Sequence, residues 1–303
     1  EPGRKPVTGA VLHLVGSGLF LALIAVVGQV YHLSSSPGNA VLLWLAGVAP
    51  LAWILRLRSQ LILSYAGFGV WLWLELIDSP GHAQFGGWFR EVFLYVSVGA
   101  AFVGCGMHLA LTRFKEFAGT TEKFGLLLMN IAAFPLCIGE AYEAPATSKG
   151  ITLSLIIATL AVGLVTLGIW RNRGTMDGDW KKLWGAAIAG LVLVATLFIT
   201  YVPEMHWHES RDNPYHWGAN VAVFLWCLAQ IRVGALRRNK WVLNTGMTFA
   251  GITLIAAYFN FSGSLEARGI VFMVGGILMV AGALVMERVR RRMIRKMAPG
   301  NPV

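Results

Sequence analysis

Long apolar runs alternate with short polar segments along the whole chain. The runs lie at approximately 7–33, 40–55, 60–77, 91–112, 124–142, 150–170, 183–202, 218–233, 241–259 and 269–286. A helix needs about 20 apolar residues to cross the hydrocarbon core of a bilayer. The second and eighth runs are short for this purpose, and Pro50 lies within the second. The pattern predicts an all-α, polytopic fold with about ten transmembrane helices in a single membrane domain over residues 1–303.

Lys and Arg residues are divided unequally between the two sides that this topology defines. Of the 25 Lys and Arg residues, all except Arg90, Lys149, Arg211 and Arg268 lie on the side that carries both termini. Because cytoplasmic loops are enriched in Lys and Arg, we predict that both termini are cytoplasmic. The net charge of +10 then follows from membrane topology, and we expect no binding to nucleic acid.

Composition agrees with a membrane protein, since 56% of the residues are hydrophobic and only 13% are charged. The last apolar run continues into the basic segment VMERVRRRMIRKM. We predict that residues 287–303 form a basic cytoplasmic tail that contacts anionic lipid headgroups. A contact with a partner protein is the alternative for this tail.

Small residues recur within the apolar runs, where they allow helices to approach closely. We expect glycines to lie at helix contacts, as listed here: Gly16, Gly18, Gly99, Gly104, Gly106, Gly275, Gly276 and Gly282. Cys105, Cys137 and Cys227 share no CxxC spacing and lie in apolar runs. These cysteines are expected to act as small apolar packing residues.

Polar residues on the outer side suggest a cavity that opens away from the cytoplasm. A carboxylate at membrane depth is costly unless it is paired or hydrated. Pro135 precedes Glu140 and can kink the predicted helix towards such a cavity. The candidates are Gln29, Tyr31, His32, Glu75, Arg90, Glu91, Asn130 and Glu140. Ordinary anchoring of helix ends at the membrane interface is the alternative interpretation.

The segment YVPEMHWHESRDNPYHW, residues 201–217, concentrates histidines and acids between two apolar runs. Glu204, His206, His208 and His216 form a candidate site for a divalent metal such as zinc. A hydrogen-bonded, pH-sensitive histidine cluster and a plain structural loop remain as alternatives. No GxxxxGK[ST] or GxGxxG motif occurs in the chain, and we predict no cofactor apart from this possible metal.

The first and last parts of the chain resemble a bacterial family. The stretch GQVYHL, followed by a polar turn and LWLAGVAPLAWILR, and the final segment ARGIVFMVGGILMVAGALVMERVRRR are similar to predicted inner-membrane proteins catalogued as domain of unknown function 2157. The resemblance implies a multi-pass protein of the bacterial inner membrane, and it carries no activity or catalytic residues. Because the chain starts at Glu1 without Met, we expect it to be the later part of a longer protein.

Three functions are compatible with these patterns. The first is a component or accessory subunit of a cell-envelope membrane assembly, with other membrane subunits as partners. The second is a transporter or channel for a small solute that uses the outward-facing cavity. The third is an enzyme at the outer face that acts on a lipid-linked substrate through the histidines of residues 201–217.

Overall fold

Helices are the only regular elements in the part of the chain that the structure describes. The computed structural model describes residues 5–31, 36–78, 88–137, 151–172, 214–261 and 265–296. The elements are α1 (Lys5–Val30), α2 (Pro37–Leu55), α3 (Arg58–Asp78), α4 (Trp88–Leu109), α5 (Lys115–Ala133), the short 3-10 helix η1 (Phe134–Cys137), α6 (Ile151–Arg171), α8 (Pro214–Leu236), α9 (Lys240–Phe261) and α10 (Leu265–Lys296). The predicted all-α class is confirmed, and the predicted span at 183–202 lies outside the described residues.

Three of these helices contain segments that are long and apolar enough to cross a membrane. The segments are Thr8–Val30, Pro37–Leu55 and Lys240–Tyr258. Shorter apolar stretches occur at Leu94–Leu109, Ala158–Arg171 and Asn220–Leu236. The chain is therefore a helical protein with several membrane-compatible segments, whereas the number of about ten spans stays a prediction.

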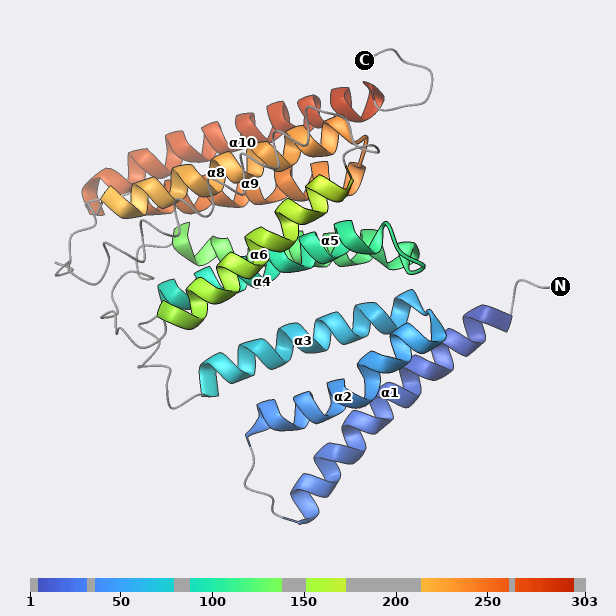
Figure 1. Cartoon of the computed structure of the whole chain (residues 1–303). Coiled ribbons are helices and arrows are strands. Elements are labelled where there is room, and N and C mark those ends of the chain that lie inside the picture. Colours follow the sequence, from blue (N-terminus) through green and yellow to red (C-terminus); the bar gives the residue numbers. More distant parts are fainter. Residues whose placement is uncertain are drawn as a thin grey trace.

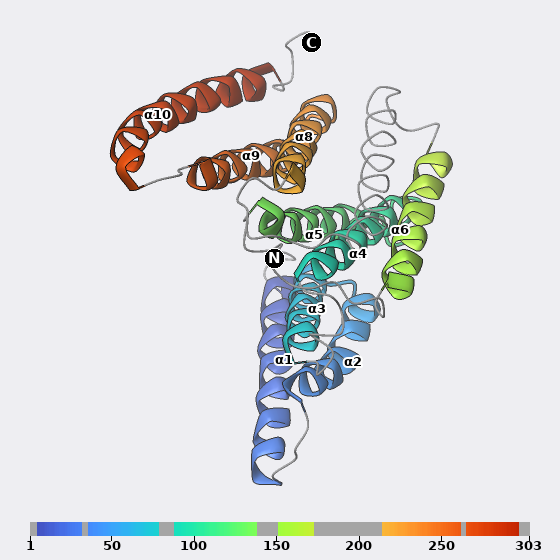
Figure 2. The same cartoon turned by 90° about the vertical axis from the view of Figure 1, so that its left-hand side faces the viewer.

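The helices form three groups that are stacked side by side. Figures 1 and 2 show α1, α2 and α3 on one side of α4, α5 and α6, and they show α8, α9 and α10 on the other side. The main hydrophobic core spans the group of α4, α5 and α6 and the group of α8, α9 and α10. In it, buried residues of α4, α5, α6, α8 and α9 pack together. Cys137 and Cys227 belong to this core at 0% and 1% exposure, which confirms their expected packing role.

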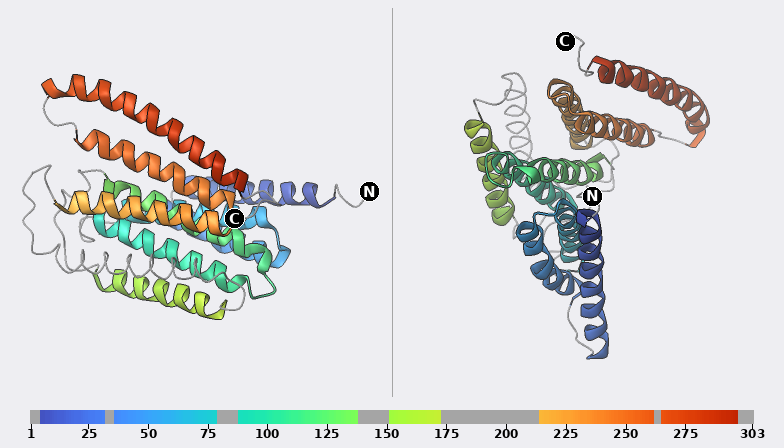
Figure 3. Two further views of the ribbon diagram at one scale, coloured as in Figure 1. Left: turned by 90° about the horizontal axis from the view of Figure 1, so that it is seen from above. Right: turned by 90° about the vertical axis from the view of Figure 1, so that its right-hand side faces the viewer.

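The basic turns share one end of the helix stack. Figures 1 and 3 place the start of α1, the α2–α3, α4–α5 and α8–α9 turns and the end of α10 at this end. The turns carry Arg56, Arg113 and Arg238, with further cations beside them. We call this region the basic end. The cations of these turns, which the sequence analysis assigns to one side of the membrane, thus also lie at one end of the structure.

Glycine permits the close approach of α4 to its neighbours. A Cβ atom on Gly99 would lie 2.8 Å from the backbone oxygen of Gly125 on α5, and a Cβ on Gly125 would lie 2.5 Å from that of Gly99. On the α6 side, a Cβ on Gly104 would lie 2.9 Å from the backbone nitrogen of Val165. Real Cβ contacts are longer than this, so the helices could not keep these positions with larger residues. The expected packing role is confirmed for α4.

Other glycines do not have the packing role that was expected. Among the residues that the structure describes, a Cβ atom on Gly16 or Gly18 of α1 would meet no atom within 4 Å, and the same holds for Gly276 and Gly282 of α10. Only 6% of the apolar segment of α1 is buried inside the chain. The first and last helices thus present glycine-bearing faces that no described residue covers.

The ends of α2 and α8 show an unusual backbone conformation. Arg56 and Arg238 adopt φ angles of 53° and 52°, and they are the non-glycine residues with positive φ among those the structure describes. Glycine normally occupies this left-handed position after a helix, and a residue with a Cβ costs roughly 1 kcal/mol more. Within α2 the helix continues through Pro50, so this proline does not end the span.

The glycine contact predicts opposite effects of alanine at two positions of α5. Gly125→Ala should lower the free energy of unfolding by about 1–3 kcal/mol, because its methyl group would overlap the backbone of α4. Gly119→Ala should leave stability unchanged or raise it by up to about 1 kcal/mol, since nothing lies within 4 Å and alanine favours helix. The measurement is the thermal stability of both variants in detergent, with loss of folded protein monitored by size-exclusion chromatography. Equal stabilities would contradict the contact.

Candidate functional site

A pair of buried amide side chains joins α5 to α8 in the middle of the structure. Asn130 and Gln230 are 2% and 1% exposed. The Asn130 Nδ2 donates to Gln230 Oε1 at 3.0 Å, and Gln230 Nε2 donates to Asn130 Oδ1 at 2.7 Å. Trp226 Nε1 donates to the same Asn130 oxygen at 3.0 Å. Both lone pairs of that oxygen are therefore used.

This amide pair has a clear physical consequence. Buried polar groups require hydrogen-bond partners, and in an apolar environment they specify which helix faces meet. Asn130 was a candidate for the outward-facing cavity, but its described contacts are with Gln230 and Trp226. The two amides are neutral and bond to each other and to Trp226, so among the described residues they form a fixed link between two helices.

A second buried polar cluster joins α1, α2 and α3. Gln60 Nε2 donates to Ser17 Oγ at 2.7 Å, and Ser17 Oγ donates to the backbone oxygen of His13 at 2.9 Å. Trp44 Nε1 donates to the backbone oxygen of Ser17 at 2.7 Å. The cluster fixes the rotation of α1 about its own axis, because only one face of that helix carries Ser17.

The second cluster is less completely satisfied than the amide pair. Gln60 is 0% exposed, yet its Oε1 atom has no hydrogen-bond partner among the residues that the structure describes. A buried acceptor without a partner carries a desolvation cost. On the other side of α3, the hydroxyl groups of Tyr65 and Thr121 lie 2.8 Å apart and connect α3 to α5. The three helix groups are thus joined by polar contacts.

Charged groups meet near the basic end. Arg237 Nη1 and Glu122 Oε2 lie 3.0 Å apart, with side-chain exposures of 27% and 14%. The contact connects the end of α8 to α5, on the same pair of helices as the buried amides. Because the carboxylate is largely shielded from water, we expect this ion pair to contribute more than a fully exposed one.

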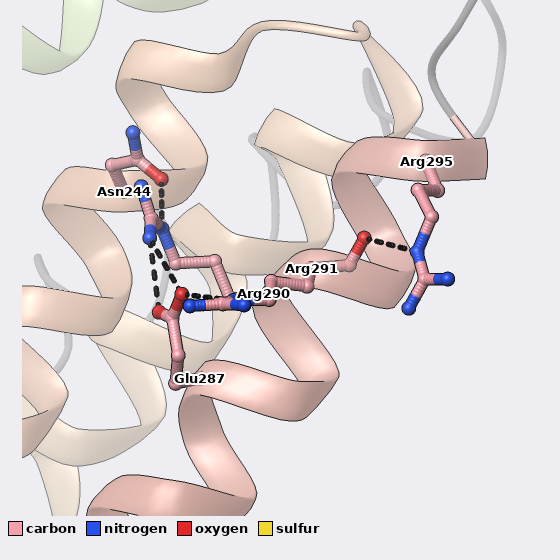
Figure 4. A network of polar contacts seen from close by, with 5 residues as sticks. All are labelled: Asn244, Glu287, Arg290, Arg291 and Arg295. Atoms are coloured by element: carbon pink, nitrogen blue, oxygen red, sulfur yellow. Dashed lines mark hydrogen bonds and ion pairs between the residues drawn. The ribbon is translucent and has the colours of Figure 1, made fainter.

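The basic extension of α10 contacts α9 through a polar residue, Arg290, and through the apolar side chains of Met293 and Ile294, which pack against the cluster of Leu243 and Met247. Arg290 Nε donates to Asn244 Oδ1 at 2.8 Å, while Glu287 accepts from both Arg290 and Arg291 (Figure 4). Hydrogen bonds from Arg291 and Arg290 hold the pKa of Glu287 below its ordinary value. Arg291 remains 72% exposed. The extension therefore has one anchored side and one side that offers cations to its surroundings.

The structure describes only some of the residues that the sequence indicated for a site. Gln29 and Tyr31 are exposed at the end of α1, and the exposed fraction of Tyr31 is 71%. Glu75, Arg90, Glu91 and His216 lie in helical turns, but their side chains are outside the described set. His32, Glu140, Glu204, His206 and His208 lie outside the described residues altogether. No group of three potential metal-ligating side chains occurs among the residues with a described placement.

Sequence reasoning did not single out four of the residues that form these clusters: Ser17, Trp44, Gln60 and Gln230. The sequence does carry a signal for the two glutamines, because an amide side chain inside an apolar run is unusual. Both Gln60 and Gln230 lie within predicted spans. Such a residue shows that a partner is needed. It does not show which helix supplies the partner, because Asn130 and Gln230 are far apart in the sequence.

The amide pair predicts a non-additive response to substitution. Asn130→Leu or Gln230→Leu alone leaves a buried amide without its partner and should destabilise the protein by about 1–2 kcal/mol. The double variant should be less destabilised than the sum of the two single variants, because both amides are removed together. Thermal stability of the four proteins in detergent measures the coupling. Strict additivity would contradict a direct contact.

Comparison with known proteins gives one family model that matches the first part of the chain. The family model described as "Predicted membrane protein (DUF2157)" matches residues 2–61. Curated proteins and solved structures gave no match. The matched segment contains α1, α2 and the start of α3, and so it includes Ser17, Trp44 and Gln60. The resemblance to this family of membrane proteins of unknown function is therefore confirmed over residues 2–61.

Proposed function

We propose that this protein is a multi-pass component of an assembly in the bacterial inner membrane, with both termini in the cytoplasm and without catalytic chemistry of its own. In this role it places helix faces for other membrane subunits. The exposed face of α1 is the observation that carries the proposal.

The face of α1 has a fixed direction and is open to a partner. The Ser17–Trp44–Gln60 cluster holds one side of α1 against α2 and α3. The remaining surface is apolar, with Leu12 and Leu19 each 66% exposed. Lipid alone would cover such a surface without any need to fix the rotation of the helix. A buried polar cluster that sets this rotation supports a role in which a particular face must be presented.

Internal packing also supports a structural role. The described amides of α5 and α8 bond to each other, and the glycines of α4 bring backbones into contact. Both features hold helices in one arrangement, since packed interiors transmit strain and do not deform gradually. A subunit that positions partners benefits from this rigidity.

The orientation in the membrane can be tested by thiol labelling. In a protein whose three cysteines are replaced, Arg113→Cys and Arg238→Cys should resist a membrane-impermeant maleimide added to intact cells. Asn39→Cys, at the exposed start of α2 on the opposite end, should react. The positive-inside preference is the physical reason. Labelling of the arginine positions with protection of position 39 would reverse the proposed topology.

The assembly role can be tested by photo-cross-linking in native membranes. A photoreactive residue at Leu12 or Leu19 should give a discrete protein adduct, because this face is proposed to meet another subunit. The same residue at Leu160 of α6, which is 62% exposed, serves as the matched control and should give mainly lipid adducts. Lipid adducts alone from all three positions would count against a partner at α1.

A further inference from the structure

Two arginines from different turns share one aromatic ring at the basic end. The guanidinium carbon of Arg56, in the α2–α3 turn, lies 5.6 Å from the ring centroid of Phe114. The guanidinium carbon of Arg113, in the α4–α5 turn, lies 4.8 Å from the same centroid. Cations are attracted to the face of an aromatic ring at such distances. One ring therefore gathers positive charge from two helix groups.

The shared ring is itself held in place. Phe114 stacks against Phe117 with ring centroids 6.2 Å apart and planes inclined by 7°. Trp53 meets Phe114 edge-on at 5.2 Å. The backbone nitrogen of Phe114 donates to Thr112 Oγ1 at 3.2 Å. Because Phe117 is fully buried, this aromatic cluster gives the two arginines a rigid platform.

The two guanidinium groups have no acidic partner in the described part of the chain. The ion pairs found there join Arg237 to Glu122 and Arg290 and Arg291 to Glu287. Arg56 and Arg113 are exposed, and the exposed cations Arg58 and Lys115 follow them closely in the sequence. Glu116 lies in the first turn of α5, but no described ion pair joins it to either arginine. Two guanidinium groups that are held at one ring repel each other. An anionic ligand would relieve this repulsion.

The backbone at Arg56 adds an independent observation. Its φ of 53° is a conformation in which glycine is normally favoured. Strained positions of this kind concentrate where a side chain has a task. Here the side chain of Arg56 is directed to Phe114, where it joins Arg113. The unfavourable backbone is thus linked to the gathering of charge.

We propose that Arg56 and Arg113, on the platform of Phe114, bind the phosphate of an anionic phospholipid headgroup. The proposal rests on the membrane placement in the proposed function, which puts these turns at the level of the headgroups. Guanidinium groups form paired hydrogen bonds with phosphate oxygens, and basic sites near cytoplasmic helix ends bind anionic lipids. Inorganic phosphate offers the same chemistry from the aqueous side. The structure favours lipid, because α2 and α4, which lead into these two turns, are apolar helices.

The test compares lipid retention in matched variants. The purified protein, with vesicles of phosphatidylcholine containing phosphatidylglycerol as the probe, should bind the anionic lipid specifically. Arg56→Gly and Arg113→Gln should each weaken this binding roughly fivefold, and the double variant roughly 25-fold. Arg171→Gln removes an exposed cation at the end of α6 and should change binding less than about twofold. Native mass spectrometry and vesicle titration measure these ratios.

The glycine variant separates loss of binding from loss of fold. Arg56→Gly should keep or raise thermal stability without lipid, because glycine suits the left-handed backbone. Lower lipid affinity in this stable variant supports the site. Equal losses in Arg171→Gln and Arg56→Gly would overturn it in favour of general surface charge.

Two further measurements show whether the bound phosphate belongs to a lipid or is free in solution, and they separate the lipid site from the membrane topology. Inorganic phosphate at millimolar concentration should not displace the lipid, and full displacement would overturn the lipid assignment. The thiol labelling described above reports topology by itself. A reversed topology with intact, arginine-dependent lipid binding would reject the proposed orientation and leave the site standing.

Discussion

Close contact between helix backbones is the constraint on which the rest of this structure depends. In a membrane, apolar side chains gain little by leaving lipid, so helices associate through close packing and polar contacts. Gly99 and Gly125 bring α4 and α5 together at distances that exclude even a methyl group. The buried core of α4, α5, α6, α8 and α9 is built around this contact. Glycine also allows close contact between α8 and α9, where a Cβ atom on Gly234 would lie 2.5 Å from the backbone nitrogen of Leu243.

Polar contacts perform a different task from glycine contacts, because they select the orientation of each helix. Asn130 and Gln230 fix α5 against α8 through two reciprocal hydrogen bonds. Ser17 and Gln60 fix α1 against α3, where the apolar packing of α1 is sparse. A helix with little buried surface can rotate at small cost unless a directional contact holds it. The location of these contacts therefore shows which helices need a defined direction.

Periodicity and length in the sequence predicted the helical class, and the grouping of cations predicted that the basic turns share one end. Both properties are local, since each run or turn carries its own signal. The pairing of Asn130 with Gln230 was not predictable, because it depends on which helices become neighbours. The glycines show the same limit. Gly99 and Gly16 occur in similar apolar runs, yet one contacts a helix and the other contacts no described residue. Residues 201–213 lie outside the described part, and so does the side chain of His216 in α8, so the proposed metal site stays a prediction.

The segment that matches the family model combines features that are separate elsewhere in the chain. Within residues 2–61, the Ser17 cluster orients α1, and Arg56 ends α2 in a left-handed conformation. The first feature directs an apolar face outwards, and the second directs a cation to the ring of Phe114, which belongs to the α4–α5 turn. Direct side-chain contacts thus connect this segment to the rest of the protein at its basic end. In the proposed function the same short segment presents the apolar face of α1 to a neighbouring subunit, and Arg56 at its α2–α3 turn contributes to the proposed phosphate site.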